Sequence, residues 1–186
     1  WVEFPAGFQL AVQNGLTIAG GVGRMDISNA TLRCQGPILL TNGASLFLWP
    51  AMGIATNLVC GGDMILGGLG SGLTTNWGAS LFAFGGPTSG ASPEYGGLIV
   101  VTGSVSIVSN GVIYPFSHNT NGGSVRFVVS NLLVAAGGGI NANGKGCRGG
   151  TTSGQYFGYG PGGGTNSGSS PPGAGYGGRG GGSTPT

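Results

Sequence analysis

One strand-like segment recurs along this chain, and that recurrence limits the folds open to it more than any other feature. The segment "TNGASLFLW" at Thr41 returns as "TNWGASLFAF" at Thr75 and, more loosely, as "SNGVIYPF" at Ser109. Glycine pairs recur in the same way, in "GGDMIL" at Gly61, "GGLIVV" at Gly96 and "GGSVRF" at Gly122. The copies lie about 26 to 35 residues apart, an interval typical of solenoids and propellers.

Short alternating segments fill the chain from Phe8 to about Ala142. Apolar and small polar residues take turns within them, which is the period of a strand with one buried face. Asparagine–glycine turn signals separate several of these segments. They are Asn14-Gly15, Asn42-Gly43, Asn110-Gly111 and Asn121-Gly122. The pattern predicts an all-β protein made of short strands.

The length of the repeat favours a right-handed parallel β-helix, or β-solenoid. A propeller blade needs about 40 residues and four antiparallel strands, more than each unit here provides. A β-sandwich or jelly roll stays open as the alternative, because frequent turns between short strands also describe one. A sandwich, however, does not require one motif to return at a fixed interval.

Stacking of the repeats predicts which residues are neighbours. In a parallel β-helix each strand pairs with its copy one turn away, about 4.8 Å along the axis. Alignment of the repeats places Leu46, Leu81 and Ile113 in one apolar column, Val105 beside Leu132, and Ile107 beside Val134. We also expect Asn29, Asn110 and Asn131 near bends, since asparagine tolerates left-handed backbone.

Composition excludes several classes of protein. Charged residues make up 5% of the chain and the formal net charge is +2, with the six basic residues scattered. A nucleic-acid partner is not expected, because phosphate binding needs a clustered basic surface. The 45 glycines follow no strict three-residue period, which argues against collagen. No apolar run approaches the length of about 20 residues that a membrane-spanning helix needs.

The residues that could perform chemistry are few and dispersed. The carboxylates are Glu3, Asp26, Asp63 and Glu94, none in a paired motif, and His118 is the single histidine. Glycoside hydrolysis needs two nearby carboxyl groups. The sequence leaves open that Asp26 and Asp63 lie close together on neighbouring turns. The separated cysteines and histidine lack zinc-site spacing. We therefore expect no enzyme activity, no cofactor and no metal.

The three cysteines allow at most one internal disulfide. Cys34 and Cys60 are the plausible pair, because both end apolar strand-like runs that can lie one turn apart. The alternative is two small buried thiols. Cys147, in the glycine-rich segment, is either free or joined to another chain.

Two regions follow from the pattern: a β-solenoid at 1–143 and a glycine-rich tail at 144–186. A solenoid end exposes unpaired backbone and apolar core, and no capping helix is evident in the sequence. Bare ends predict head-to-tail stacking, which does not close and so makes a filament. We expect the tail to strap neighbouring subunits through Cys147, Tyr156, Phe157, Tyr159 and Tyr176, or else to pack along its own solenoid.

The passages "VVSNLLVAAGGGINANGKGCRGG", "GYGPGGG" and "GAGYGGRGGG" resemble those of glycine-rich parallel β-helix surface proteins of bacteria. That family is similar in architecture to pectate-lyase-like and autotransporter-passenger solenoids. The resemblance implies a secreted, extracellular or cell-surface protein with a structural or adhesive role, and it carries over no catalytic residue. The sequence thus predicts a homopolymeric extracellular fibre. The alternative is an adhesin or phage-type receptor-binding tip that binds surface glycans.

Overall fold

A computed structural model describes residues 5, 7–21, 23–50, 56–68, 78–88, 95–119 and 123–146 of the chain. Every regular element within these residues is a β-strand, which confirms the all-β prediction. The proposed solenoid at 1–143 is therefore described over most of its length. Of the predicted tail at 144–186, only residues 144–146 lie among the described residues.

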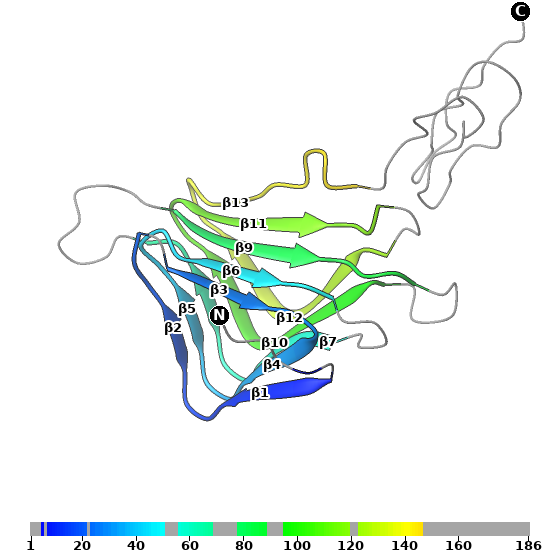
Figure 1. Cartoon of the computed structure of the whole chain (residues 1–186). Coiled ribbons are helices and arrows are strands. Elements are labelled where there is room, and N and C mark those ends of the chain that lie inside the picture. Colours follow the sequence, from blue (N-terminus) through cyan, green and yellow to red (C-terminus); the bar gives the residue numbers. More distant parts are fainter. Residues whose placement is uncertain are drawn as a thin grey trace, which may run out of the picture.

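The strands form five successive passes, where a pass is one crossing of both sheets before the chain returns (Figure 1). The first pass holds β1 (Phe8–Val12), β2 (Leu16–Ile18) and β3 (Arg24–Ile27), and the second holds β4 (Ala30–Cys34), β5 (Ile38–Leu40) and β6 (Ser45–Leu48). The third holds β7 (Thr56–Cys60), β8 (Met64–Leu66) and β9 (Ala79–Phe84). The fourth holds β10 (Gly97–Ile107) and β11 (Gly111–Phe116), and the fifth β12 (Val125–Val134) and β13 (Gly139–Ile140).

Two parallel sheets result from this order. The first has the order β1-β4-β7-β10-β8-β5-β2 with β12 also paired to β10, and the second has the order β13-β11-β9-β6-β3. Strand β10 pairs with β7 through its first half and with β8 through its second. This one long strand therefore continues both sides of the first sheet, where one side is the stack β1-β4-β7 and the other is the stack β2-β5-β8. All of these pairs among the described strands are parallel, so the antiparallel sandwich or jelly roll alternative is wrong.

The register confirms the predicted columns. Leu46 lies opposite Leu81, and Leu81 lies opposite Ile113. Val105 lies opposite Leu132, and Ile107 opposite Val134. Like side chains stack on like because each pass repeats the strand positions of the pass before it.

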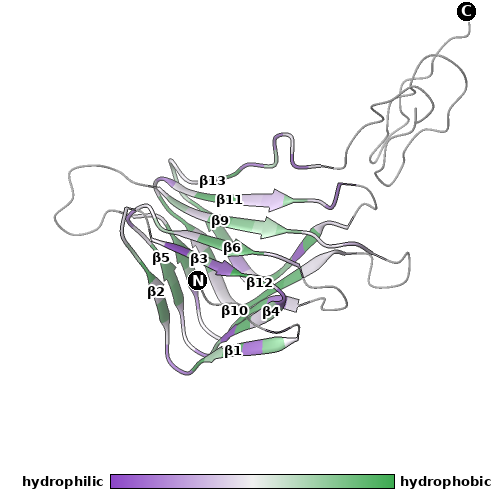
Figure 2. Ribbon diagram, viewed as in Figure 1, coloured by the Kyte–Doolittle hydropathy of each residue, from purple (hydrophilic) through white to green (hydrophobic). Residues whose placement is uncertain are grey.

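Alternate residues of the strands point into the space between the sheets and form the core. Figure 2 shows β2, β5 and β9 coloured largely as hydrophobic, as expected for strands that contribute to an apolar interior. The middle passes are the most completely enclosed, with leucines that have no exposed surface. These leucines are Leu32, Leu40, Leu46, Leu58, Leu66 and Leu81. Burial of this apolar surface drives the folding of the chain.

Asparagine occupies left-handed backbone at two of the three expected positions. Asn29 has φ of 56° and Asn110 has φ of 61°, and Asn42 of a predicted turn has φ of 56°. Asn131 lies in β12 opposite Ser104, where the paired strand β10 changes partner from β7 to β8, so it is near a bend as expected. Its backbone, however, is not left-handed. The preceding register shift in β10 lets β12 continue from one side to the next without a separate turn.

Glycine allows close backbone approach at the corner between the first two sides. A Cβ built on Gly36 would collide with the carbonyl oxygen of Asn14 in the preceding pass, and one built on Gly61 with that of Gln35. A Cβ on Gly103 would lie 2.8 Å from the carbonyl oxygen of Gly62. Successive passes therefore meet at this corner without room for a side chain, which explains part of the glycine content.

Replacement of Gly36 by alanine is expected to destabilise the protein by about 1–3 kcal/mol, the usual cost of an overpacked site, because rigid backbone faces the new methyl group. Gly139→Ala is the matched control, since a Cβ there meets nothing within 4 Å. Urea unfolding of both variants measures the difference. Equal stability of the two variants would contradict the close approach at this corner.

Candidate functional site

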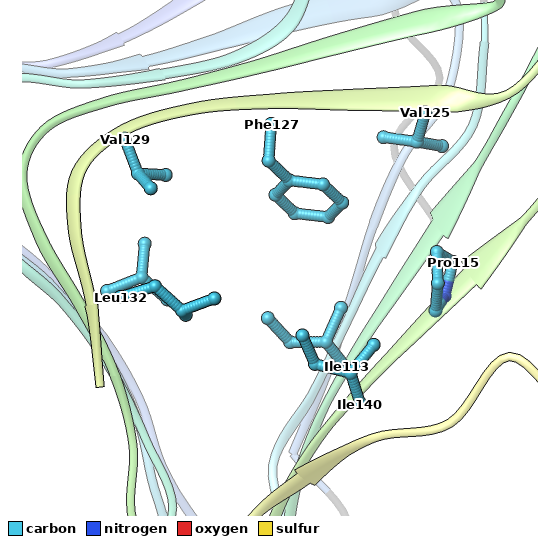
Figure 3. Close-up of a pocket in the computed structure, with 8 residues that line it drawn as sticks. Ile113, Pro115, Val125, Phe127, Val129, Leu132 and Ile140 are labelled. Carbon is cyan, nitrogen blue, oxygen red and sulfur yellow. The ribbon is translucent and has the colours of Figure 1, made fainter. Parts of the chain in front are cut away.

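Among the described residues, no strand covers the core at the end formed by the fifth pass. A cavity of about 240 Å³ opens there between the walls of the two sheets. Figure 3 shows apolar side chains from β12, β11 and β13 pointing into the space. The lining residues are Val105, Ile113, Pro115, Val125, Phe127, Val129, Leu132 and Ile140. None of the described residues that line this cavity is charged, so this lining suits apolar groups.

Exposure rises sharply from the fourth pass to the fifth. Val105 and Ile113 in the fourth pass are each 2% exposed. Their partners in the fifth pass, Leu132 and Ile140, are 48% and 51% exposed. The same inward positions are therefore core in one pass and surface in the next, because no further strand lies over β12 and β13 among the described residues.

The opposite end has the same character. Strands β1, β2 and β3 each have one described neighbour, namely β4, β5 and β6. Phe8 is 38% exposed. Ile27 of this first pass is buried. Five other inward side chains are only partly buried against the core: Leu10, Val12, Leu16, Ile18 and Met25. Both ends thus present apolar side chains together with strand edges.

Two columns of aromatic rings lie on the outer face of the second sheet. Phe47, Phe82 and Tyr114 form one column, with ring centroids 4.3 Å and 4.8 Å apart. Trp49, Phe84 and Phe116 form the other, with centroids 3.9 Å and 4.4 Å apart. Rings of successive passes stack nearly face to face, so the faces between neighbouring rings of a column are covered. Stacked pairs of this kind stabilise the outer face beyond their buried area.

Cations cover one end of each column. The Arg24 guanidinium lies 4.0 Å from the centroid of Phe47, and the Lys145 ammonium lies 4.4 Å from that of Phe116. Sequence reasoning missed the columns, although the signal was present. The segments "SLFLW", "SLFAF" and "VIYPF" each carry aromatic residues two positions apart, and that spacing puts both on one strand face.

Asp26 is held at the edge of this aromatic face by two donors. Arg24 forms an ion pair with it, with Nε to Oδ2 at 2.6 Å, and the Trp49 indole donates to Oδ1 at 3.2 Å. The hydrogen bond from Arg24 is the main reason that the pKa of Asp26 lies below its ordinary value. Partial burial opposes this effect, and the hydrogen bond from Trp49 adds to it.

Replacement of Asp26 by asparagine is expected to remove one pH-dependent contribution to stability. A carboxyl group whose pKa is lowered on folding stabilises the protein above its unfolded pKa of about 3.9, and that stability is lost as pH falls through the folded pKa. The difference in unfolding free energy between wild type and Asp26→Asn should therefore be constant above about pH 5 and shrink in acid. Urea unfolding from pH 7 to pH 2 measures it, and a pH-independent difference would contradict the Arg24 pairing.

The structure does not bring the two candidate aspartates together. Asp26 lies on β3 in the second sheet, whereas Asp63 lies in the turn between β7 and β8 of the first sheet. There the Asp63 Oδ1 accepts a hydrogen bond from the Ser104 backbone at 2.8 Å, a structural role. Glu3 and Glu94 lie outside the described residues. The backbone N–H of His118 donates to the Gly123 carbonyl at 2.6 Å. In the described part of the chain no cluster of metal-ligating side chains occurs.

Cys34 and Cys60 lie directly opposite each other in β4 and β7, one pass apart as the sequence suggested. Both are buried and free, and the Cys60 thiol lies 3.4 Å from the carbonyl oxygens of Gly36 and Gly62. Burial raises the pKa of Cys60. The Cys34–Cys60 disulfide stays a prediction.

The residues predicted to strap subunits together, Cys147, Tyr156, Phe157, Tyr159 and Tyr176, lie outside the described residues. Lys145 lies inside them, and its backbone carbonyl accepts a hydrogen bond from Ser117 at 2.7 Å.

Comparison with protein-family models, curated proteins and solved structures finds no match for this chain. Among the residues that the structure describes, none forms a helix of the length and hydropathy needed to cross a membrane.

Proposed function

We propose that the protein is a β-solenoid subunit of an extracellular fibre, which grows by head-to-tail stacking of its two ends. The uncovered apolar end formed by β12 and β13 carries this proposal. It combines a cavity of about 240 Å³ with the side chains of Leu132 and Ile140, which are about half exposed. Removal of such an apolar surface from water lowers the free energy, so it favours association of the monomers.

The strand edges add a second reason. An exposed edge offers unpaired N–H and C=O groups, and monomeric proteins usually guard such edges with charge, proline, bulges or covering elements. Along β12 only Arg126 is charged, and its guanidinium lies 5.6 Å from the centroid of the Tyr95 ring. With charged residues at 5% of the chain, little repulsion opposes association.

In this proposal the tail at 144–186 reinforces each junction. The tail begins near the open end, because the backbone carbonyl of Lys145 accepts a hydrogen bond from the backbone N–H of Ser117, just beyond β11. Cys147 follows two residues after Lys145 in the sequence, and in this proposal it links neighbouring subunits.

Negative-stain electron microscopy of the purified protein over a dilution series tests the proposal. We expect fibres above a critical concentration, with an axial repeat near five strand spacings, roughly 25 Å. Reductant-sensitive fibres would implicate Cys147. Discrete particles at every concentration would rule out the fibre.

An adhesin or receptor-binding tip that binds surface glycans is the second candidate, and the aromatic columns favour it. Their six rings are all partly exposed on the outer face of the second sheet. Sugar binding, however, uses free ring faces, and here most of the ring faces are stacked on one another, with centroids 3.9–4.8 Å apart. The fibre therefore ranks first. Binding of a soluble monomer or trimer to a glycan array, without fibres, would reverse the order.

A further inference from the structure

Five inward columns of the core run through all five passes. One column, for example, joins Leu10, Leu32, Leu58, Ile99 and Phe127. Four other columns behave in the same way. They begin at Val12, Leu16, Ile18 and Met25 and end at Val129, Leu132, Val134 and Ile140, respectively.

The first and last members of these columns are the side chains that the core leaves partly uncovered. Each column therefore stops at an apolar side chain at both ends, and none of these terminal positions carries a charge. The two ends can consequently be apposed without burying an unpaired charge, the most costly defect of an interface. The apolar residues at one end are also of the type that would continue the apolar columns at the other end.

The strand edges match as well. Strand β12 covers the two sides that β1 and β2 cover in the first pass, and β13 lies on the side of β3. All neighbouring strands in the described part of the chain are parallel, so a first pass placed over the fifth would meet it in that same orientation. The step is one strand spacing, about 4.8 Å.

The geometry points to a specific junction between two copies of this chain. Strand β12 of one copy pairs in parallel with β1 and β2 of the next, with Phe127 opposite Leu10, Val129 opposite Val12, Leu132 opposite Leu16 and Val134 opposite Ile18. Strand β13 lies beside β3, with Ile140 opposite Met25. Leu10, Leu16 and Met25 of the second copy cover the cavity at the open end.

This inference rests on the proposed fibre and makes it more specific. The junction repeats the packing found between passes inside one subunit, so both sheets and all five columns continue across it. Because the contact joins two different surfaces, the same operation applies again to every added copy, and the result is an open filament.

Cysteine pairs on the outward face test the register. The same chain of pairings places Ala11 opposite Val128 and Thr17 opposite Leu133 of the neighbouring copy. All four residues are exposed, so substitution should leave the fold intact. Directly opposite residues of paired strands lie about 4.8 Å apart, within the Cα range of a disulfide.

All variants are made in the full-length chain with Cys147→Ser. This substitution removes cross-links through the thiol of Cys147. The matched variants are Ala11→Cys with Val128→Cys, and Thr17→Cys with Leu133→Cys. The swapped variants, Ala11→Cys with Leu133→Cys and Thr17→Cys with Val128→Cys, are the controls. Each variant is assembled, oxidised with dioxygen and a copper catalyst, and separated on a denaturing, non-reducing gel.

We expect the matched pairs to give a ladder of covalent dimers, trimers and longer chains, and the swapped pairs to remain monomeric. Fibres with ladders from the swapped pairs would overturn the register. Fibres without any ladder would show that another segment, such as residues 147–186, occupies the open end, and would overturn the junction while leaving the fibre standing. Absence of fibres and ladders in every variant would overturn both proposals.

Discussion

Replacement of Leu132 by lysine is expected to abolish fibre formation while the monomer stays folded. Leu132 is 48% exposed in the monomer, so a lysine there can extend its ammonium group into water at little cost. In the proposed junction the same position lies inside a continuous apolar column, where an unpaired charge costs several kcal/mol. Because 1.4 kcal/mol corresponds to a tenfold change in binding, we expect the critical concentration for assembly to rise at least about 100-fold.

Leu133→Lys is the matched control for this experiment. Leu133 is the next residue on β12, is 54% exposed, and lies opposite Ser106, whose column faces outward. It adds the same charge to the same edge strand without entering the core. Sedimentation of assembled protein over a concentration series, with circular dichroism as the check on folding, compares the two variants. Equal assembly by Leu132→Lys and wild type would show that the open end is not an assembly surface.

The largest expected loss of stability comes from Leu81→Ala in the middle of the core. Leu81 has no exposed surface, and it lies between Leu46 and Ile113 in one column. Rigid strands on both sides cannot collapse into the space, so the variant should lose about 2–5 kcal/mol of unfolding free energy. Contacts in this architecture run mainly between adjacent passes, so the loss should be felt by both neighbouring passes.

Urea unfolding below the critical concentration measures this loss without a contribution from assembly, which would otherwise add to the apparent stability. Leu133→Ala is the control, because the same side chain is removed from an exposed position, where the change should stay within about 0.5 kcal/mol. Similar losses for the two variants would contradict the central position of Leu81.

Several features were readable because the protein repeats itself. Stacking of copies of "SLFLW" and "SLFAF" leads directly to the pairing of Leu46 with Leu81, without any other knowledge of the fold. The adjacency of Cys34 and Cys60 followed for the same reason, since both end equivalent strands. Asn29 and Asn110 were correct because their left-handed backbone is a local property.

Other features depended on where whole passes lie. Asn131 lies near a bend like the turn asparagines, but its backbone is not left-handed, because β12 continues across this bend as a strand, as β10 does. The separation of Asp26 from Asp63 could not be predicted either, since distance along the chain does not tell which of two sheets receives a residue. The aromatic columns needed both the two-residue spacing and the outward orientation of those positions.

The sequence by itself determined the all-β character, the parallel stacking of like residues and the left-handed turn positions, because each follows from local period or from repetition. Only the tertiary structure decided that the fifth pass leaves Phe127, Leu132 and Ile140 around an open cavity. The exposure of side chains at the end of a stack depends on whether another pass lies above it. The alternation of apolar and polar residues within a strand does not reveal this, because it is the same whether the inward face is covered or exposed.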